Sequence, residues 1–266
     1  MRKLSLLLLL ALPAPVVFAH AAFAQEEWTS GSPRDGGASE VLQSIYIPPM
    51  HNAPFTATVH TEWARPLACG GTNTIVNQRK ISRDRDGRLY EERWLLIPKN
   101  NPNYRSVMNL IQVYDPNQHT GYDCFLIGPQ KNHCELRSYA GIVRTEIPAR
   151  TGPLPNNLGY RTHEDLGIRM IEGIETTGTR DTSTINAGVG GNDQPMKIVR
   201  EYWHSAQLGI NLLSILSDPR IGTQTFTLTD VAVTEPDPKF FELPEGFQIV
   251  DTRQPEDQQK SAAPQN

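Results

Sequence analysis

Histidines near carboxylates are the residues of this chain whose types and spacing could support acid–base chemistry. Three places bring a histidine close to an acidic or aromatic neighbour: His60 near Glu62, His163 before Glu164 and Asp165, and His204 after Trp203. A histidine beside an acid can act as a general base. No nucleophile elbow, metalloprotease helix, phosphate-binding loop or dinucleotide fingerprint accompanies them. We therefore expect a protein without enzymatic activity and without a cofactor.

The three cysteines offer a second kind of chemistry. Tyr122 to Ile127 and Lys131 to Arg137 are typical of two strands joined by a turn at 128–130. A register that pairs Ile127 with Lys131 sets Cys124 opposite Cys134, at a separation that a disulfide can bridge. We predict that bond, with Cys69 left free or buried.

A metal site is the alternative interpretation of the same hairpin. Its four ligands would be His119, Cys124, His133 and Cys134. Adjacent residues of a strand point to opposite faces, so His133 and Cys134 cannot easily share one ion. The spacing favours the disulfide, and we expect no bound metal.

One predicted strand is apolar on both faces. Within Ile210 to Leu216, apolar residues stand at both odd and even positions, so both faces of this strand must be covered. Either it is a central strand of the core, or one face lines an apolar cavity. The candidate binding residues on this strand and the next one are Leu212, Leu216, Phe226 and Leu228.

The elements around these residues are almost all strands. Runs rich in Thr, Val and Ile are separated by turn signals such as Asp86-Gly87 and Glu172-Gly173. The expected strands are Thr56–Trp63, Asn73–Ser82, Arg88–Ile97, Val107–Tyr114, Tyr122–Ile127, Lys131–Arg137, Ile142–Ile147, Asp165–Ile171, Ile174–Ile185, Met196–His204, Ile210–Leu216 and Thr223–Thr234, with a short helix at Ser39–Tyr46. The fold class is mainly β: a large curved antiparallel sheet or open β-barrel of about 10 to 12 strands with few short helices.

The N-terminus has the pattern of a secretory signal peptide. Arg2 and Lys3 precede an apolar stretch, and Ala22 and Ala24 are small residues placed for cleavage. We expect cleavage between Ala24 and Gln25, and a protein that is periplasmic or secreted, with no membrane span in the mature chain. The predicted organisation is a signal peptide at 1–24, a disordered segment at 25–40, one β-rich domain at 41–250 and a disordered tail at 251–266.

The charge balance argues against nucleic acid as a partner. The chain has 25 basic and 29 acidic residues, and 23 basic residues would remain after loss of Arg2 and Lys3. Binding to phosphates requires a basic excess or a basic stripe. The one basic cluster, around Arg83, is interleaved with Asp84 and Asp86, as on a solvated hairpin.

Several segments of the second half resemble a set of uncharacterised exported bacterial proteins, themselves distantly similar to the periplasmic lipoprotein carrier and receptor group (LolA/LolB-like). The segments are Glu164-Asp165-Leu166-Gly167, Ile171-Glu172-Gly173, Gly190-Gly191-Asn192-Asp193, Arg200-Glu201-Tyr202-Trp203, Ser217-Asp218-Pro219-Arg220, and Pro236-Asp237-Pro238 leading to Phe240-Phe241-Glu242-Leu243-Pro244. The resemblance covers about residues 56 to 250. It implies an open β-barrel around an apolar cavity, closed by helices that shield acyl chains. This sequence departs from that pattern because it contains few helix signals.

Two non-enzymatic functions follow from these observations. In the first, an envelope protein binds a lipid or lipoprotein acyl chain, or another apolar ligand, in the concavity of its sheet. In the second, the sheet surface is a protein-interaction or sensory module of the cell envelope. An open apolar interior would favour the first, and a filled interior with an exposed edge would favour the second. A third function, an exported enzyme with an unrecognised active site, would be favoured if an acid, a base and a pocket converged in space. The ligand, the partner and the oligomeric state stay open at this point.

Overall fold

The computed structural model describes residues 45–140 and 150–253, which all belong to one compact unit, Val41–Asn266. The predicted signal peptide, its cleavage site at Ala24 and Gln25, the segment 25–40, the strand at 142–147 and the tail from residue 254 lie outside the described residues. Most of the short helix expected at 39–46 lies outside them too. Within the described part, no helix is long and apolar enough to cross a membrane.

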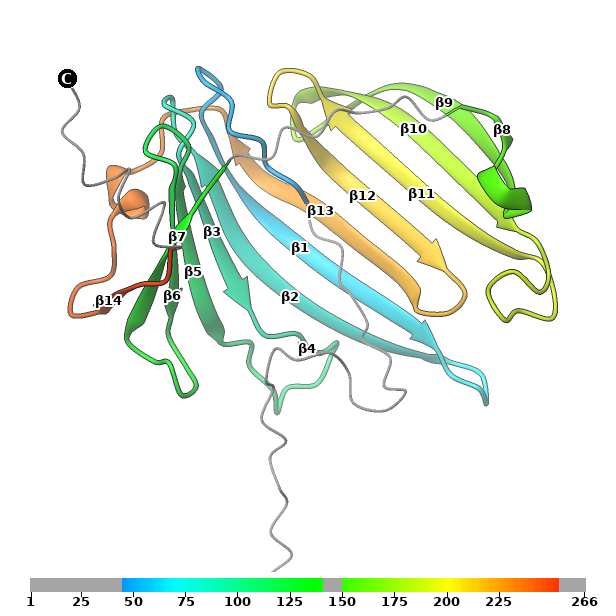
Figure 1. Cartoon of the computed structure of the whole chain (residues 1–266), viewed down its shortest axis with the longest axis horizontal. Coiled ribbons are helices and arrows are strands. Elements are labelled where there is room, and N and C mark those ends of the chain that lie inside the picture. Colours follow the sequence, from blue (N-terminus) through cyan, green and yellow to red (C-terminus); the bar gives the residue numbers. More distant parts are fainter. Residues whose placement is uncertain (1–44, 141–149, 254–266) are drawn as a thin grey trace, which may run out of the picture. The chain divides into compact units, whose positions relative to one another are not determined.

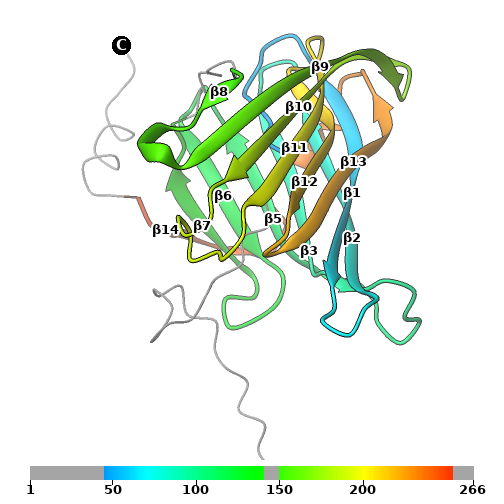
Figure 2. The same cartoon turned by 90° about the vertical axis from the view of Figure 1, so that its right-hand side faces the viewer.

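The described residues form one sheet of fourteen strands (Figures 1 and 2). The strands are β1 (Phe55–Pro66), β2 (Thr72–Arg83), β3 (Leu89–Trp94), β4 (Ile97–Pro98), β5 (Met108–Asp115), β6 (Thr120–Phe125), β7 (His133–Ser138), β8 (Gly152–Pro153), β9 (Gly159–Ile171), β10 (Ile174–Ile185), β11 (Met196–Ser205), β12 (Ile210–Asp218), β13 (Gly222–Ala232) and β14 (Gln248–Asp251). Their order is β14-β7-β6-β5-β3-β2-β1-β13-β12-β11-β10-β9-β8, with β4 beside β2. The two end strands do not pair with each other, so the sheet is not closed into a barrel.

The predicted fold class is confirmed, and the strand count is somewhat larger than expected. The additional strands are short: β4 and β8 have two residues each and β14 has four. β14 pairs with β7 in parallel, whereas every other pairing is antiparallel. The helical segments of the described part are two 3₁₀ turns, η1 (Pro155–Asn157) and η2 (Pro238–Phe241).

The prediction of one continuous strand is wrong in one place, where the structure has two. Arg88 to Ile97 was expected as a single strand, but β3 ends at Trp94 and β4 begins at Ile97. Leu95 and Leu96 separate the two strands, and β4 then pairs with β2 one residue out of the β2–β3 register, with Val76 opposite Ile97. This interruption shapes the candidate site described below.

Strict alternation along β1 and β13 gives the sheet two unlike faces. On one face, Phe55, Val59, Phe226 and Leu228 are buried, and they pack with Ile45 and Ile47 from the segment before β1. We call this the core face. The opposite face of the same strands carries threonines, because Thr alternates with the apolar residues in both. Burial of each large apolar side chain contributes about 1.5 to 3 kcal/mol.

Arg83 at the end of β2 joins two separate segments, the one before β1 and the turn after β11, to the core. Its guanidinium donates to the backbone carbonyls of Ala53 (2.9 Å), Pro48 (2.9 Å) and Leu208 (2.6 Å), and it lies over the Phe55 ring. No carboxylate is among these partners. Burial lowers the pKa of Arg83 to about 10, so the group keeps its charge at neutral pH. The planar fork matches several carbonyls at once, which lysine cannot do.

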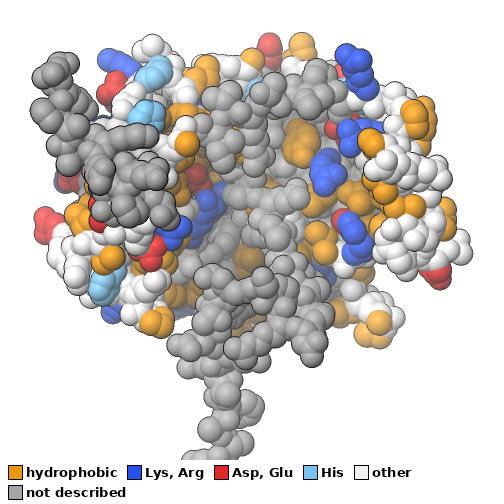
Figure 3. Space-filling view, viewed as in Figure 1, with side chains coloured by type: hydrophobic (Ala, Val, Ile, Leu, Met, Phe, Trp, Pro, Cys, Tyr) orange, Lys and Arg blue, Asp and Glu red, His pale blue; other side chains and the backbone are white. Residues whose placement is uncertain are grey.

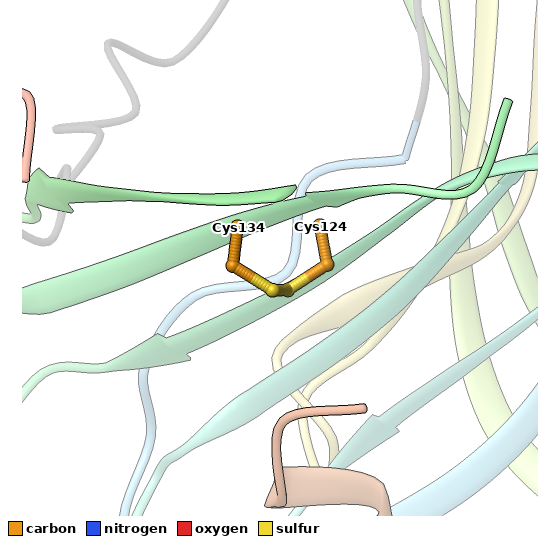
Figure 4. Close-up of a disulfide and its surroundings, with 2 residues drawn as sticks. All are labelled: Cys124 and Cys134. Carbon is orange, nitrogen blue, oxygen red and sulfur yellow. A yellow bond between two sulfur atoms is a disulfide. The ribbon is translucent and has the colours of Figure 1, made fainter. Parts of the chain in front are cut away.

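The predicted disulfide is confirmed. Cys124 on β6 and Cys134 on β7 are directly opposite, with Cα atoms 4.0 Å apart, and their sulfurs are bonded (Figure 4). Both residues are fully buried. Closing this short loop stabilises the fold by about 2 to 3 kcal/mol in the chain-entropy model. Cys69 is exposed and free.

Replacing Arg83 tests whether its hydrogen bonds to backbone carbonyls stabilise the fold. We expect Arg83→Ala to lower the free energy of unfolding by about 3 kcal/mol or more, because two buried carbonyls and one partly buried carbonyl lose their donor. Arg85→Ala, two residues along on the exposed hairpin tip, is the matched control and should change it by less than about 0.5 kcal/mol. Urea unfolding followed by circular dichroism measures both. Equal effects would contradict the account.

Candidate functional site

The site begins where β2 and β3 separate. The two strands pair only from Ile81 to Arg83, and β2 pairs again with β4 at Ile75 and Val76. Between these two places the ladder is interrupted over residues 77–80. Side chains take over its hydrogen bonds: the Asn77 amide donates to the Trp94 carbonyl at 2.6 Å, and Glu92 accepts from the Lys80 backbone. The sheet therefore contains an opening along β2.

A cavity of about 830 Å³ lies at this opening. Its volume is within the range of small-ligand sites in proteins. β1, β2, β3, β4 and β13 all contribute to it, together with the segment that follows β4. The lining residues are Thr58, His60, Thr61, Glu62, Val76, Asn77, Gln78, Arg79, Lys80, Glu92, Trp94, Ile97, Lys99, Asn100, Ser106, Thr225 and Thr227. Most of the β1 and β13 residues in this set belong to the threonine-bearing face, not to the core face. We call this cavity the β2 groove.

The Glu92 carboxylate lines the β2 groove and connects β3 to β2. It is buried and accepts three hydrogen bonds: from the Lys80 backbone N–H (3.0 Å), the Trp94 indole (2.7 Å) and the Tyr90 hydroxyl (3.0 Å). The backbone donor of Lys80 is thus satisfied by a side chain instead of by β3. Burial and the neighbouring Glu92 charge raise the pKa of Tyr90, which keeps its hydroxyl available as a donor.

The other ionisable groups of the groove are also held by neighbours. The Lys99 ammonium lies 2.6 Å from the Glu62 carboxylate, and β4 fixes this contact because the Lys99 N–H donates to the Thr74 carbonyl. The His60 imidazole hydrogen-bonds to the Thr229 hydroxyl at 2.8 Å. His60 and Glu62 therefore both line the groove, but they do not contact each other: His60 is bonded to Thr229 and Glu62 to Lys99. This arrangement provides no histidine oriented by an acid.

Other polar side chains of the groove have no interaction partner within the described residues. Within residues 45–140 and 150–253, no hydrogen bond or ion pair engages the side chains of Thr58, Gln78, Lys80, Asn100, Thr225 and Thr227. Gln78, Lys80 and Asn100 are exposed, and the three threonines are partly buried. The groove thus presents free donors and acceptors above a floor made by β1 and β13.

The other histidines singled out from the sequence lie elsewhere. His163 on β9 contacts Asp181 (2.7 Å) and Asp165 (3.5 Å), and its hydrogen bond to Asp181 raises its pKa. His204 on β11 contacts the Asn211 side chain at 3.0 Å. Neither lines the β2 groove. Across the described part of the chain, no group of three or more ligating side chains is placed to hold a metal ion.

The four candidate binding residues on β12 and β13 share the core face. Leu212, Phe226 and Leu228 belong to the cluster that contains Ile45 and Ile47. Leu216, on the same strand as Leu212, is also buried. Leu213 and Ile215, on the opposite face, pair with Thr227 and Thr225. None of the four lines the β2 groove. Their contact with an apolar ligand stays a prediction.

The residues of the groove on β2 and β3 were not identified from the sequence alone. Gln78, Lys80 and Trp94 carry no motif, and they come together through pairings between distant parts of the chain. Pro98 was the one available signal, since proline cannot donate within a ladder and tends to occur at strand edges and interruptions.

Comparison with protein-family models and with curated proteins gives no match for this chain. Solved structures match it in fold. MucB, in its complex with MucA from Pseudomonas aeruginosa, is 14% identical over 75% of this chain and 59% of that chain, with a TM-score of 0.38. An uncharacterised conserved protein from Thermus thermophilus is 8% identical over 75% of this chain and 91% of that chain, with a TM-score of 0.37.

A LolA superfamily protein from Nitrosomonas europaea is 9% identical over 72% of this chain and 91% of that chain, with a TM-score of 0.27. The match spans less than two thirds of the MucB chain. At these identities the likeness concerns the fold alone.

Replacing Glu92 tests whether its three hydrogen bonds stabilise the interrupted part of the β2–β3 pairing. We expect Glu92→Ala to lower the free energy of unfolding by about 3 kcal/mol, because three donors lose their acceptor. Glu62→Ala removes a carboxylate from the same groove but only from an exposed ion pair, so its effect should stay below about 1 kcal/mol. Chemical denaturation of the two variants measures the difference. Indistinguishable values would show that Glu92 has no special structural role.

Proposed function

We propose that this chain is an exported, non-enzymatic binding protein of the cell envelope, and that the β2 groove is its ligand site. The groove carries the proposal, because it combines a volume of about 830 Å³ with polar side chains that have no partner in the described part of the chain. Such groups are available to a ligand without breaking an existing contact. The signal-peptide pattern at residues 1–24 supports export.

Binding fits the groove better than catalysis. A general base needs a free lone pair within hydrogen-bond reach of its substrate. His60, Glu62 and Glu92 are all engaged by neighbouring groups. The remaining free groups are hydroxyls, amides and the Lys80 ammonium, which recognise a ligand but do not form an acid–base pair with one another.

The expected apolar site in the concavity of the sheet has less support. Leu212 and Phe226 pack within a continuous cluster, and three of the groove residues, Val76, Trp94 and Ile97, offer an alternative apolar surface next to polar groups. We therefore assign the ligand to the groove and keep Leu212, Leu216, Phe226 and Leu228 as structural residues of the core face.

Filling the groove tests the proposal. Thr227→Trp places a large ring on the floor, where Thr227 faces His60 across the β1–β13 ladder. We expect protein purified from its own envelope to lose any co-purified ligand, as seen by native mass spectrometry, while its melting temperature stays within a few degrees. Thr162→Trp, on exposed β9, is the control and should keep the ligand. A ligand retained in Thr227→Trp would remove the groove as its site.

Within the described residues, one edge of the sheet is uncovered, and this favours a second candidate function, protein interaction. β9 pairs with β8 only at Tyr160 and Arg161, and Thr151 hydrogen-bonds to the backbone of His163. In the described part of the chain no strand covers residues 164–171 on that side. There Ile168 is 70% exposed and Met170 is 59% exposed. An uncovered edge with apolar side chains can accept an added strand.

Basic and hydrophobic side chains lie close together over β10 to β12, on the face shown in Figure 3. Hydrophobic groups surrounded by charges are typical of interaction surfaces. This pattern is consistent with a partner that approaches the β9 end of the sheet.

Site-directed crosslinking tests the edge. A photoreactive residue replacing Ile168 should form a defined protein adduct in intact envelopes, because this exposed position lies on the uncovered edge strand. The same residue replacing Val233, an exposed position after β13, should form none. If both positions react alike, or if neither does, β9 is not a specific interface.

A further inference from the structure

The lining of the β2 groove restricts the chemistry of its ligand, provided that the groove is the binding site proposed above. Partnerless hydroxyl and amide groups form a two-dimensional array on the paired strands. Thr58 stands opposite Lys80 on β2, and His60 stands between Gln78 on β2 and Thr227 on β13. Directly opposite residues of a sheet have side chains about 5 Å apart. The array therefore offers hydrogen bonds at regular short intervals in two directions.

An alkyl chain matches this surface poorly. Burying a polar group without a hydrogen-bond partner costs roughly what burial of one to four methylene groups gains. A chain laid over Thr58, Gln78, Asn100, Thr225 and Thr227 would remove water from at least five such side chains and return no hydrogen bond. Val76, Ile97 and Trp94 alone do not offset that loss.

A polyhydroxylated ligand matches the same surface well. Its hydroxyls both donate and accept, as do the threonine hydroxyls and the amides of Gln78 and Asn100. The partly exposed Trp94 ring provides a flat apolar surface for the C–H face of a sugar ring. The methyl groups of Thr225 and Thr227 and the Lys80 stem add apolar area between the polar atoms.

The charges of the groove favour a ligand with little net charge. Glu62 is paired with Lys99. Lys80 lies next to the buried Glu92, whose carboxylate accepts the Lys80 backbone N–H. Arg79, which also lines the groove, is paired with Glu91. The two acids and two lysines of the lining match in number, although within the described residues the Lys80 ammonium has no ion-pair partner. A strongly anionic or cationic ligand would leave part of this set uncompensated.

We propose that the β2 groove binds a neutral saccharide, with Trp94 stacking on a sugar ring and with Gln78, Asn100 and the threonines of β1 and β13 hydrogen-bonding to its hydroxyls. The size of the groove fits a short oligosaccharide segment and not a whole polymer. The ligand class follows from the side chains without existing partners and from the balance of charge.

Isothermal titration of the exported chain tests this assignment. The probes are four neutral tetrasaccharides, of β-1,4-linked N-acetylglucosamine, β-1,4-linked glucose, β-1,3-linked glucose and α-1,6-linked glucose, with hexadecanoate as the apolar comparison. We expect at least one tetrasaccharide to bind and hexadecanoate not to bind. Trp94→Ala and Gln78→Ala should each weaken binding about tenfold or more. Tyr104→Ala removes an exposed aromatic from the same connecting segment, outside the groove, and should leave affinity unchanged.

Gln78→Ala guards against misfolding as an explanation, because the Gln78 side chain is exposed and its loss should not change the melting temperature. If no tetrasaccharide binds, or if binding survives both Gln78→Ala and Thr227→Trp, the saccharide assignment is overturned. If hexadecanoate binds and Thr227→Trp abolishes its binding, the groove remains the ligand site but the ligand class is apolar. If no probe binds and Thr227→Trp also leaves co-purified ligands unchanged, the groove itself falls as the site.

Discussion

The Glu92 carboxylate replaces part of a β-ladder, and the architecture around the groove depends on that replacement. A backbone N–H in the middle of a sheet must find an acceptor, and in this sheet the Lys80 N–H finds a side chain. β3 is thereby released from β2 after Glu91. The chain then passes through Leu95 and Leu96 and pairs with β2 again as β4, one residue out of the earlier register. Without a buried acceptor at position 92, the Lys80 N–H, the Trp94 indole and the Tyr90 hydroxyl would lose their partner.

The two faces of the sheet have separate tasks. The core face collects the apolar residues of β1, β12 and β13 under the segment 45–53, and Arg83 fastens that segment through backbone carbonyls. Stability is thus concentrated on one side. The threonine-bearing face contributes little to the core, and its hydroxyls on Thr225 and Thr227 are free for another use. Packing and recognition consequently do not compete for the same residues.

Local signals in the sequence predict most of the sheet but not the groove. The Asp86-Gly87 turn and the hairpin at 171–174 were recognisable because glycine accepts the positive φ that each turn requires, as Gly87 and Gly173 show. The Cys124–Cys134 bond followed from register alone. The end of β3 at Trp94 has no such local cause. It depends on a contact between Glu92 and a backbone donor twelve residues earlier, and alternation within one strand cannot reveal it.

The most direct test is a crystal structure of the protein isolated from its own envelope without unfolding. The account predicts that β2 and β3 remain apart beyond Glu91, and that ligand density lies in the opening within hydrogen-bond distance of Gln78 and next to the Trp94 ring. Continuous pairing of β3 with residues 77–80 of β2, or density confined to the face of Leu212 and Phe226, would contradict it.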